Sequence, residues 1–189
     1  MIEKKYKRTA LRSPMNSQFI YSWDKKVLRS RTFNISQGGI LLEAIPNVEV
    51  GDVIPIMMEL PKIPIFANFK EQDIFNLDPL KFNRDIIRLK IEVVRIHEGP
   101  ISFDKSIVAQ MGGKFFKSSE NLVNEINNYV DSYKKNVVFL LNLIADLGQG
   151  KKQMPLLSHI AYLLGYQIKD SISLLRQKVL HDYQSLEDF

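Results

Sequence analysis

Two short polar motifs near the N-terminus contain the residues with the clearest potential for binding chemistry. Arg8 and Arg12 form an R-x-x-x-R pair in a basic segment, and the stretch Asn34–Gly39 contains N-x-S-x-x-G. An arginine presents a planar fork of donors that can pair with two phosphate oxygens or with the edge of a guanine. Asparagine, serine and glycine are also common turn residues, so either motif alone is weak evidence for a site.

The spacing between the two motifs is more informative than either motif. Arg12 and Asn34 are 22 residues apart. The residues between them read as a strand over Gln18–Trp23, a turn, and a second strand over Val27–Phe33, because apolar or β-branched side chains alternate with polar ones. The glycine pair that follows leads into a third short strand. The two motifs together, in this strand context, form a specific pattern.

The pattern resembles the PilZ domain, a bacterial receptor module for cyclic di-GMP. The resemblance covers about residues 3–133, and the insertion over 61–88 departs from it. Further segments that match are Ile40–Leu42, Val50–Asp52, Val93–Arg95 and Gly113–Phe116. The resemblance implies an antiparallel β-barrel that binds cyclic di-GMP as a ligand.

Each motif would contact a different part of this ligand, which carries two phosphodiester anions and two guanines. By resemblance, Arg8 and Arg12 bind phosphate and base, and the N-x-S-x-x-G turn lines the guanine pocket. A glycine in such a turn lets the backbone approach a ligand closely. The candidate ligand-binding residues are Lys7, Arg8, Arg12, Asn34, Ser36 and Gly39.

The N-terminal arm suggests how binding could become a signal. Residues 1–12 carry five basic side chains and a single acidic one. We expect this arm to be mobile without ligand and to fold over the nucleotide when it binds. The predicted function is a cyclic di-GMP receptor or effector that acts on a protein target, which the sequence does not identify.

The remaining sequence predicts a mainly β region followed by helices, α+β overall. The alternating apolar pattern is confined to the first 116 residues, while apolar residues recur at helical spacing after Ser118. The predicted domains are a PilZ-like barrel over 1–117, with the insertion at 61–88, and a helical extension over 118–189. The predicted helices cover 119–147, about 155–164 and about 168–183.

The long helix carries a heptad seam of apolar residues that ends near Leu147. Its first half would cover the barrel of the same chain. Its second half, Val137–Leu147, is too apolar to face water, so it would pack on the following helices or on a second copy of the chain. We predict a homodimer through this segment.

The later helices offer an alternative function. Leu157–Tyr166 looks like the first helix and turn of a helix-turn-helix of the AraC type, with Ala161 and Gly165 four residues apart. The second helix has a thin basic face, so we expect DNA affinity to be weak. The alternatives are a transcription regulator controlled by cyclic di-GMP and a PilZ-like adaptor that binds no nucleotide.

Composition excludes several other classes of protein. The chain has 189 residues, no cysteine and a net charge of +5, and residues 1–31 alone carry +7. Thiolate metal sites, disulfides and a thiol nucleophile are therefore absent. The three histidines are far apart, and no phosphate loop or nucleophile elbow is found. We expect no enzyme activity, no metal, no cofactor, no membrane span and a cytoplasmic location.

Overall fold

The computed structural model describes residues 12–15, 17–97, 109–146, 154–166 and 171–186. The chain divides into two compact units. The barrel unit contains Arg12–Leu60 and Arg84–Asn128, and the helical unit contains Pro61–Asn83 and Tyr129–Phe189. The sequence-based division at residue 117 stays a prediction.

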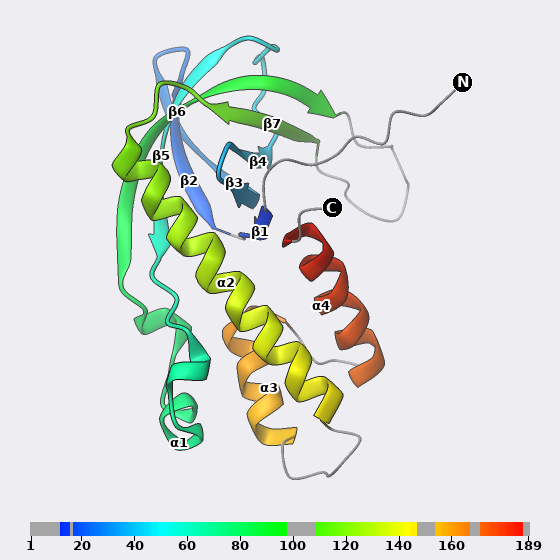
Figure 1. Cartoon of the computed structure of the whole chain (residues 1–189). Helices are drawn as coiled ribbons and strands as arrows, with labels where there is room; N and C mark the ends of the chain where they lie inside the picture. Colours follow the sequence, from blue (N-terminus) through cyan, green and yellow to red (C-terminus); the bar gives the residue numbers. More distant parts are fainter. Residues whose placement is uncertain (1–11, 16, 98–108, 147–153, 167–170, 187–189) are drawn as a thin grey trace, which may run out of the picture. The chain divides into compact units, whose positions relative to one another are not determined.

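Antiparallel strands form the barrel unit (Figure 1). They are β1 (Arg12–Pro14), β2 (Gln18–Trp23), β3 (Lys26–Ser36), β4 (Gly39–Glu43), β5 (Val53–Pro61), β6 (Arg84–His97) and β7 (Gln110–Phe115). The strand order is β1-β3-β2-β5-β6-β7-β4, and β4 pairs back onto β3. Six strands therefore close into a barrel, and β1 adds to the edge of β3. This confirms the predicted antiparallel barrel followed by helices.

Alternating side chains fill the barrel. Along β5, for example, Ile54, Ile56 and Met58 point inward and are buried, while their neighbours in the strand are more exposed. The largest fully buried side chains of this unit include Phe19, Ile35, Leu42, Ile54, Ile91 and Met111. β6 begins at Arg84, inside the predicted insertion, because residues 84–88 continue the same alternation.

The helical unit contains the insertion and most of the later helices. Its elements are the 3-10 turns η1 (Phe66–Asn68) and η2 (Pro79–Lys81) and the helices α1 (Glu71–Phe75), α3 (Met154–Leu163) and α4 (Ile172–Leu186). The helix α2 (Glu120–Asp146) begins in the barrel unit and continues through the helical unit.

Buried side chains along α2 account for the heptad seam. Val137 and Leu140 are fully buried and Ile144 is 8% exposed within a single chain. Beside them, Asn136 binds the insertion with both ends of its amide. Its Nδ2 donates to the Pro64 carbonyl at 2.8 Å, and its Oδ1 accepts from the Phe66 N–H at 2.8 Å. The seam therefore does not require a second copy of the chain. Leu147 lies outside the described residues.

The ends of α3 and α4 follow from local backbone chemistry. Gly165 has φ +82°, and the N–H groups of Gly165 and Tyr166 donate to the carbonyls of Tyr162 and Ala161. This is the Schellman arrangement, which ends a helix at a residue in the left-handed region. α4 begins at Ile172 in the described part of the chain, where the Ser171 hydroxyl accepts from the Leu174 N–H and caps the first turn. The predicted start near residue 168 lies outside the described residues.

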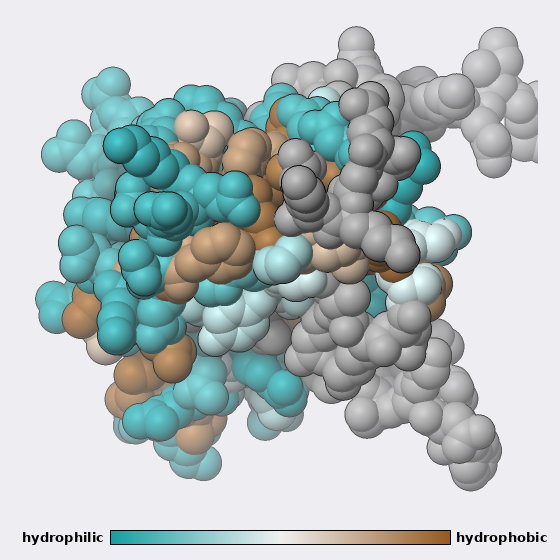
Figure 2. Space-filling view, turned by 90° about the horizontal axis from the view of Figure 1, so that it is seen from below, coloured by the Kyte–Doolittle hydropathy of each residue, from teal (hydrophilic) through white to brown (hydrophobic). Residues whose placement is uncertain are grey.

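Hydrophobic side chains also reach the surface of both units. Figure 2 shows one face, where hydrophobic areas in brown lie between hydrophilic side chains in teal. The exposed large hydrophobic residues include Val27, Leu28, Val50 and Ile86 in the barrel unit and Leu80, Tyr162 and Leu174 in the helical unit. Within the described parts of the chain, no helix combines the length and apolar composition needed to cross a membrane.

Candidate ligand-binding site

An irregularity in β3 turns the N-x-S-x-x-G side chains outward. The pairing of β3 with β4 shifts between Thr32 and Asn34, so one extra residue, Phe33, stands in β3. Thr32 and Ile35 are both fully buried although two residues stand between them, whereas a regular strand has one residue between neighbours on the same face. A β-bulge explains this change of phase. Asn34 and Ser36 therefore alternate with the inward Ile35 and lie on the outer face of the barrel.

The strand β1 brings the arginine motif to the same place. Arg12 lies directly opposite Ser36, and Pro14 lies opposite Asn34. Side chains that are opposite each other in an antiparallel pair share a face of the sheet. Arg12 therefore shares the outer face with Asn34 and Ser36. Lys7 and Arg8 lie outside the described residues.

The Ser36 hydroxyl stabilises the turn that follows it. Its Oγ donates to the Gly39 carbonyl oxygen at 3.1 Å, and the residue is 8% exposed. The hydroxyl has one proton, so towards a ligand it can act as an acceptor while this bond is kept. The half-buried Asn34 amide makes no side-chain hydrogen bond with any residue that the structure describes. Asn34 is thus the freer of the two to contact a base.

Gly39 is required by the packing of the strands. A Cβ built on Gly39 would collide with the carbonyl oxygen of Gly113 on β7. The structure thus shows close approach to Gly39 by a neighbouring strand, and close approach by a ligand stays a prediction. Gly38 differs, because a Cβ there would meet no atom within 4 Å.

Arg95 reaches the same face from the other side and is not among the candidate residues that the sequence indicated. The pairing of β6 with β7 shifts between Val93 and Arg95, so Val94 is an extra residue. Because Val93 is buried, this bulge places Arg95 on the outer face, opposite Gly112. A Cβ on Gly112 would lie 2.7 Å from Arg95 Nε and 2.9 Å from its Cγ. The arginine side chain therefore lies across the space that glycine leaves open.

A row across five strands links the two sides of the site. Arg95 is opposite Gly112, Gly112 is opposite Leu41, and Leu41 is opposite Asn34. Pro14 ends the row beside Asn34. The outer face thus has an arginine near each end and an asparagine amide between them. The sequence signal for Arg95 is an arginine after a Val-Val pair, but its partner glycine becomes visible only with the strand register.

The charges around this row favour an anion. Arg95 makes no side-chain ion pair with a described residue. The carboxylate of Glu43 on β4 forms an ion pair with Arg31, whose Nε lies 3.5 Å from Glu43 Oε2. The same oxygen accepts a hydrogen bond from the Ser30 hydroxyl at 3.3 Å. Among the described residues, no group of three or more histidines and carboxylates could hold a metal ion. The site offers hydrogen-bond donors and positive charge.

A second polar cluster is buried in the helical unit. Tyr166 donates to Asp182 Oδ2 at 2.8 Å, and the Tyr133 hydroxyl lies 3.4 Å from that of Tyr166. Burial raises the pKa of Tyr133 and of Tyr166 above the ordinary value of 10.0, and the negative charge of Asp182 adds to the increase. This cluster ties the turn after α3 to α4 and to α2. The helix-turn-helix resemblance thus falls on an internally bonded helical pair.

Comparison with known proteins gives low-identity structural similarity. No protein-family model and no curated protein matches the sequence. The structure of the Bacillus subtilis inhibitor of motility, MotI/DgrA, is similar with a TM-score of 0.49 and 16% identity over 68% of this chain. The PilZ domain of Escherichia coli YcgR, solved with c-di-GMP, gives a TM-score of 0.43 and 13% identity over 76% of this chain.

A further similar structure is the c-di-GMP complex of MrkH from K. pneumonia, with a TM-score of 0.42 and 14% identity over 75% of this chain. The matched region spans 54% of the inhibitor of motility and 54% of MrkH, and 98% of the isolated YcgR domain.

Proposed function

We propose that this chain is a receptor for cyclic di-GMP and that the nucleotide binds on the outer face formed by β1, β3, β4 and β7. One observation carries the proposal. The strand register places Arg12 directly opposite Ser36, so the second arginine of R-x-x-x-R stands beside the N-x-S-x-x-G turn. Two motifs that are weak evidence separately therefore meet on one surface.

The chemistry of the row suits a ligand with two phosphates and two guanines. The Arg12 guanidinium can pair with phosphate or with guanine O6 and N7. The Asn34 amide offers both a donor and an acceptor for a base edge. Arg95 can stack on a base or bind the second phosphate from the β6 side. Arg8 and Lys7 would complete the charge from the preceding arm.

We propose that the signal is the ordering of this arm. Residues 1–12 carry positive charge that the nucleotide phosphates would neutralise. Binding would fix Arg8 over the ligand, beside Arg12, which β1 already holds opposite Ser36, and would present a new surface to a protein target. The chain would act as an effector in the cytoplasm rather than as an enzyme.

Calorimetric titration with cyclic di-GMP tests the proposal, with GTP and cyclic di-AMP as control ligands. Arg12→Ala removes a charge-assisted contact worth about 1.5–3 kcal/mol, so affinity should fall by roughly 10- to 150-fold. Arg12→Lys should not restore affinity, because an ammonium cannot pair with two acceptors in one plane. Arg176→Ala removes the same charge from α4 and should leave affinity unchanged. Equal binding by the parent and Arg12→Ala, or no binding by either, would end the proposal.

The helical unit leaves two related expectations open. A homodimer through Val137–Leu147 stays a prediction, although Val137 and Leu140 are already buried within one chain. Light scattering at high micromolar concentration decides it, since a monodisperse monomer contradicts it. DNA binding by α3 and α4 should be weak, and affinity that survives physiological salt and is lost in Arg176→Ala would favour the transcription regulator instead.

A further inference from the structure

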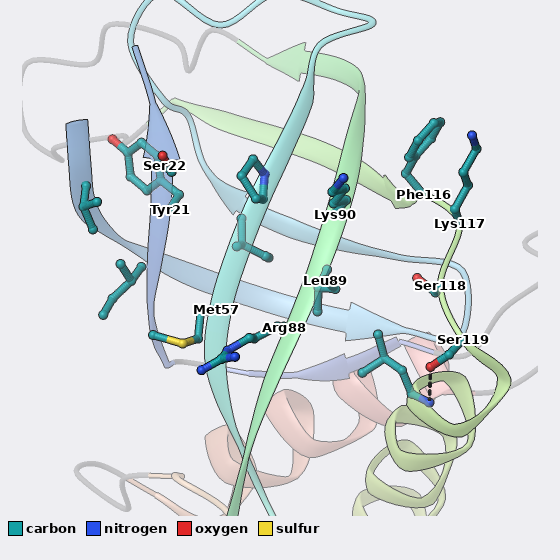
Figure 3. A pocket seen from close by; sticks show the side chains of 15 residues that line it. Tyr21, Ser22, Met57, Arg88, Leu89, Lys90, Phe116, Lys117, Ser118 and Ser119 are labelled. Atoms are coloured by element: carbon teal, nitrogen blue, oxygen red, sulfur yellow. Dashed lines mark hydrogen bonds between the residues drawn. The ribbon is translucent and has the colours of Figure 1, made fainter. Parts of the chain in front are cut away.

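The barrel unit has a second hollowed surface, away from the row that carries Asn34. It is a cavity of about 620 Å³ over the outer faces of β2, β5 and β6, closed on one side by the segment Phe116–Leu122. Figure 3 shows Arg88 and Lys90 between two walls, with Tyr21 and Ser22 on one side and Phe116 to Ser119 on the other.

A neighbouring hollow extends this surface along the sheet. It has a volume of about 480 Å³ and shares Ile20 and Met57 with the first. Its lining also includes Arg29 and Ile86, and Ile86 is 67% exposed. The two hollows adjoin at Ile20 and Met57 on the outer face of β2, β5 and β6, and we call them together the β5 groove.

The charge of the β5 groove is one-sided. The first hollow is lined by three cations, Arg88, Lys90 and Lys117, and by no carboxylate. In the second hollow, the single carboxylate Glu59 is already paired with Arg84 at 2.6 Å. The side chains of Arg29, Arg88 and Lys90 make no ion pair with any residue in the described ranges. Positive charge is thus left without a counter-charge next to apolar surface.

One wall of the groove also has an unused polar group. Ser118 Oγ is buried and has no hydrogen-bond partner among the described residues, whereas the neighbouring Ser119 Oγ accepts from the Leu122 N–H and caps α2. A buried hydroxyl without a partner costs free energy unless an incoming group bonds to it. A carboxylate from a ligand could accept from Ser118 while its charge is balanced by Lys117.

We propose that the β5 groove binds an extended polypeptide segment of a partner protein that carries both acidic and large apolar side chains. The cations select carboxylates, and Ile20, Met57 and Ile86 select apolar side chains. The cations Arg29, Arg88 and Lys90 are exposed, which favours a segment lying along the surface over a small molecule enclosed in a pocket. A bilayer surface is flat and does not follow a hollow.

Selection from a random library of displayed ten-residue peptides against the full chain tests this proposal. We expect enriched peptides to combine Asp or Glu with Leu, Ile, Phe or Met. The best peptide is then synthesised with a fluorescent label, and its affinity is measured by anisotropy. In the double variant Arg88→Glu, Lys90→Glu, affinity should fall by about tenfold or more, because two attractive charges become repulsive.

Two further double variants serve as controls for the loss of peptide affinity in Arg88→Glu, Lys90→Glu. Lys135→Glu with Lys178→Glu makes the same charge change on exposed positions of α2 and α4, and should leave peptide affinity unchanged. Arg88→Gln with Lys90→Gln removes the charges without reversing them, and should give an intermediate loss. Cyclic di-GMP affinity should be the same in all these variants, so failure of this proposal and failure of the proposed function are distinguishable.

Several outcomes would overturn the proposal. These are no enriched peptide, enriched peptides without acidic residues, or equal affinity for the parent and the Glu double variant. Binding of phosphatidylglycerol vesicles that the double variant abolishes, without any peptide binding, would assign the surface to a membrane instead. A dimer of the parent that dissociates in the double variant would assign it to a second copy of the chain.

Discussion

The barrel unit and the helical unit position their polar groups in different ways. In the barrel unit, the backbone register positions the polar side chains. The bulge at Phe33 turns Asn34 to the outer face, and the bulge at Val94 turns Arg95 to the same face. In the helical unit, buried side chains position the polar groups. The Asn136 amide joins α2 to the insertion, and Tyr166 joins the turn after α3 to α4.

The difference predicts where each unit is vulnerable. A register depends on close backbone approach, so the barrel should be sensitive to side chains added at glycines. A buried polar network depends on each partner, so the helical unit should be sensitive to side chains removed. The two units also have separate probes. The single tryptophan, Trp23, lies in β2, while circular dichroism at 222 nm reports mainly on the helices.

The largest effect should come from Asn136→Ala. This change leaves the Phe66 N–H and the Pro64 carbonyl without their partner in a buried site. Each unsatisfied group costs about 1–3 kcal/mol, so the free energy of unfolding should fall by roughly 2–6 kcal/mol. Urea denaturation followed at 222 nm measures it. Asn142→Ala, at an exposed position of the same helix, should change stability by less than about 0.5 kcal/mol.

If Asn136→Ala lowers the urea midpoint of the Trp23 fluorescence transition as much as it lowers the midpoint at 222 nm, the expected difference between the two units is wrong. This result would mean that both units unfold together and that Asn136 stabilises the whole chain. A shift confined to the 222 nm transition would support separate vulnerability.

The second effect is Gly39→Ala in the barrel. The new Cβ would collide with the Gly113 carbonyl oxygen, which is backbone and cannot rotate away. Overpacking of this kind costs about 1–3 kcal/mol, so the Trp23 fluorescence transition should move to lower urea concentration. Gly38→Ala is the matched control, since a Cβ there has open space. Equal stability of the two variants would show that β4 can move away from β7 at little cost.

The sequence predicted the barrel because its signal is periodic and local. Ile54, Ile56 and Met58 alternate with outward residues, and this alternation is visible without any partner strand. The two motifs were predicted to act together, and the register of β1 on β3 now places Arg12 beside Ser36. That Arg12 and its neighbours bind a nucleotide stays a prediction.

Contacts between distant residues could not be predicted in the same way. A bulge adds one residue to a strand and leaves no mark in composition, so the outward turn of Arg95 is invisible until Gly112 is placed opposite it. Asn136 lies 70 residues after Phe66, and one asparagine beside an apolar seam does not reveal its partner. The packing reason for Gly39 was not visible either, because strand packing and ligand approach both require a missing side chain. Its role towards a ligand stays a prediction.

The third effect separates binding from stability. Gly112→Ala would push the new Cβ into Arg95 Nε and Cγ, which belong to a flexible side chain that can move. Stability should therefore change little, while cyclic di-GMP affinity should fall by about tenfold, equivalent to about 1.4 kcal/mol. Calorimetry of Gly112→Ala, Arg95→Ala and the double variant measures this. If Gly112→Ala still weakens binding in the Arg95→Ala background, the glycine acts by another route.

The smallest effect concerns alkaline pH and the buried tyrosines. Burial raises the folded-state pKa of Tyr133 above 10.0, so folding favours the protonated phenol. The stabilisation that comes from this raised pKa is fully present below pH 10, and it is lost as the pH rises towards the folded-state pKa of Tyr133. Tyr133→Phe should therefore cost less than about 1 kcal/mol at pH 7, since its hydrogen bonds are 3.4 and 3.5 Å long. Above pH 10 the free energy of unfolding of Tyr133→Phe should fall less steeply with pH than that of the parent, by up to about 1.4 kcal/mol per pH unit.

Urea denaturation at 222 nm from pH 8 to pH 11 measures this slope. Tyr162→Phe removes a phenol that is 56% exposed on α3, so it should leave the slope unchanged. Tyr166→Phe is a less direct test, because it also leaves Asp182 without its donor. A parent and a Tyr133→Phe variant with the same slope would mean that the phenol ionises without opening the helical unit. The buried cluster would then tolerate charge, and the helical unit would be less dependent on its polar side chains than the Asn136 contacts indicate.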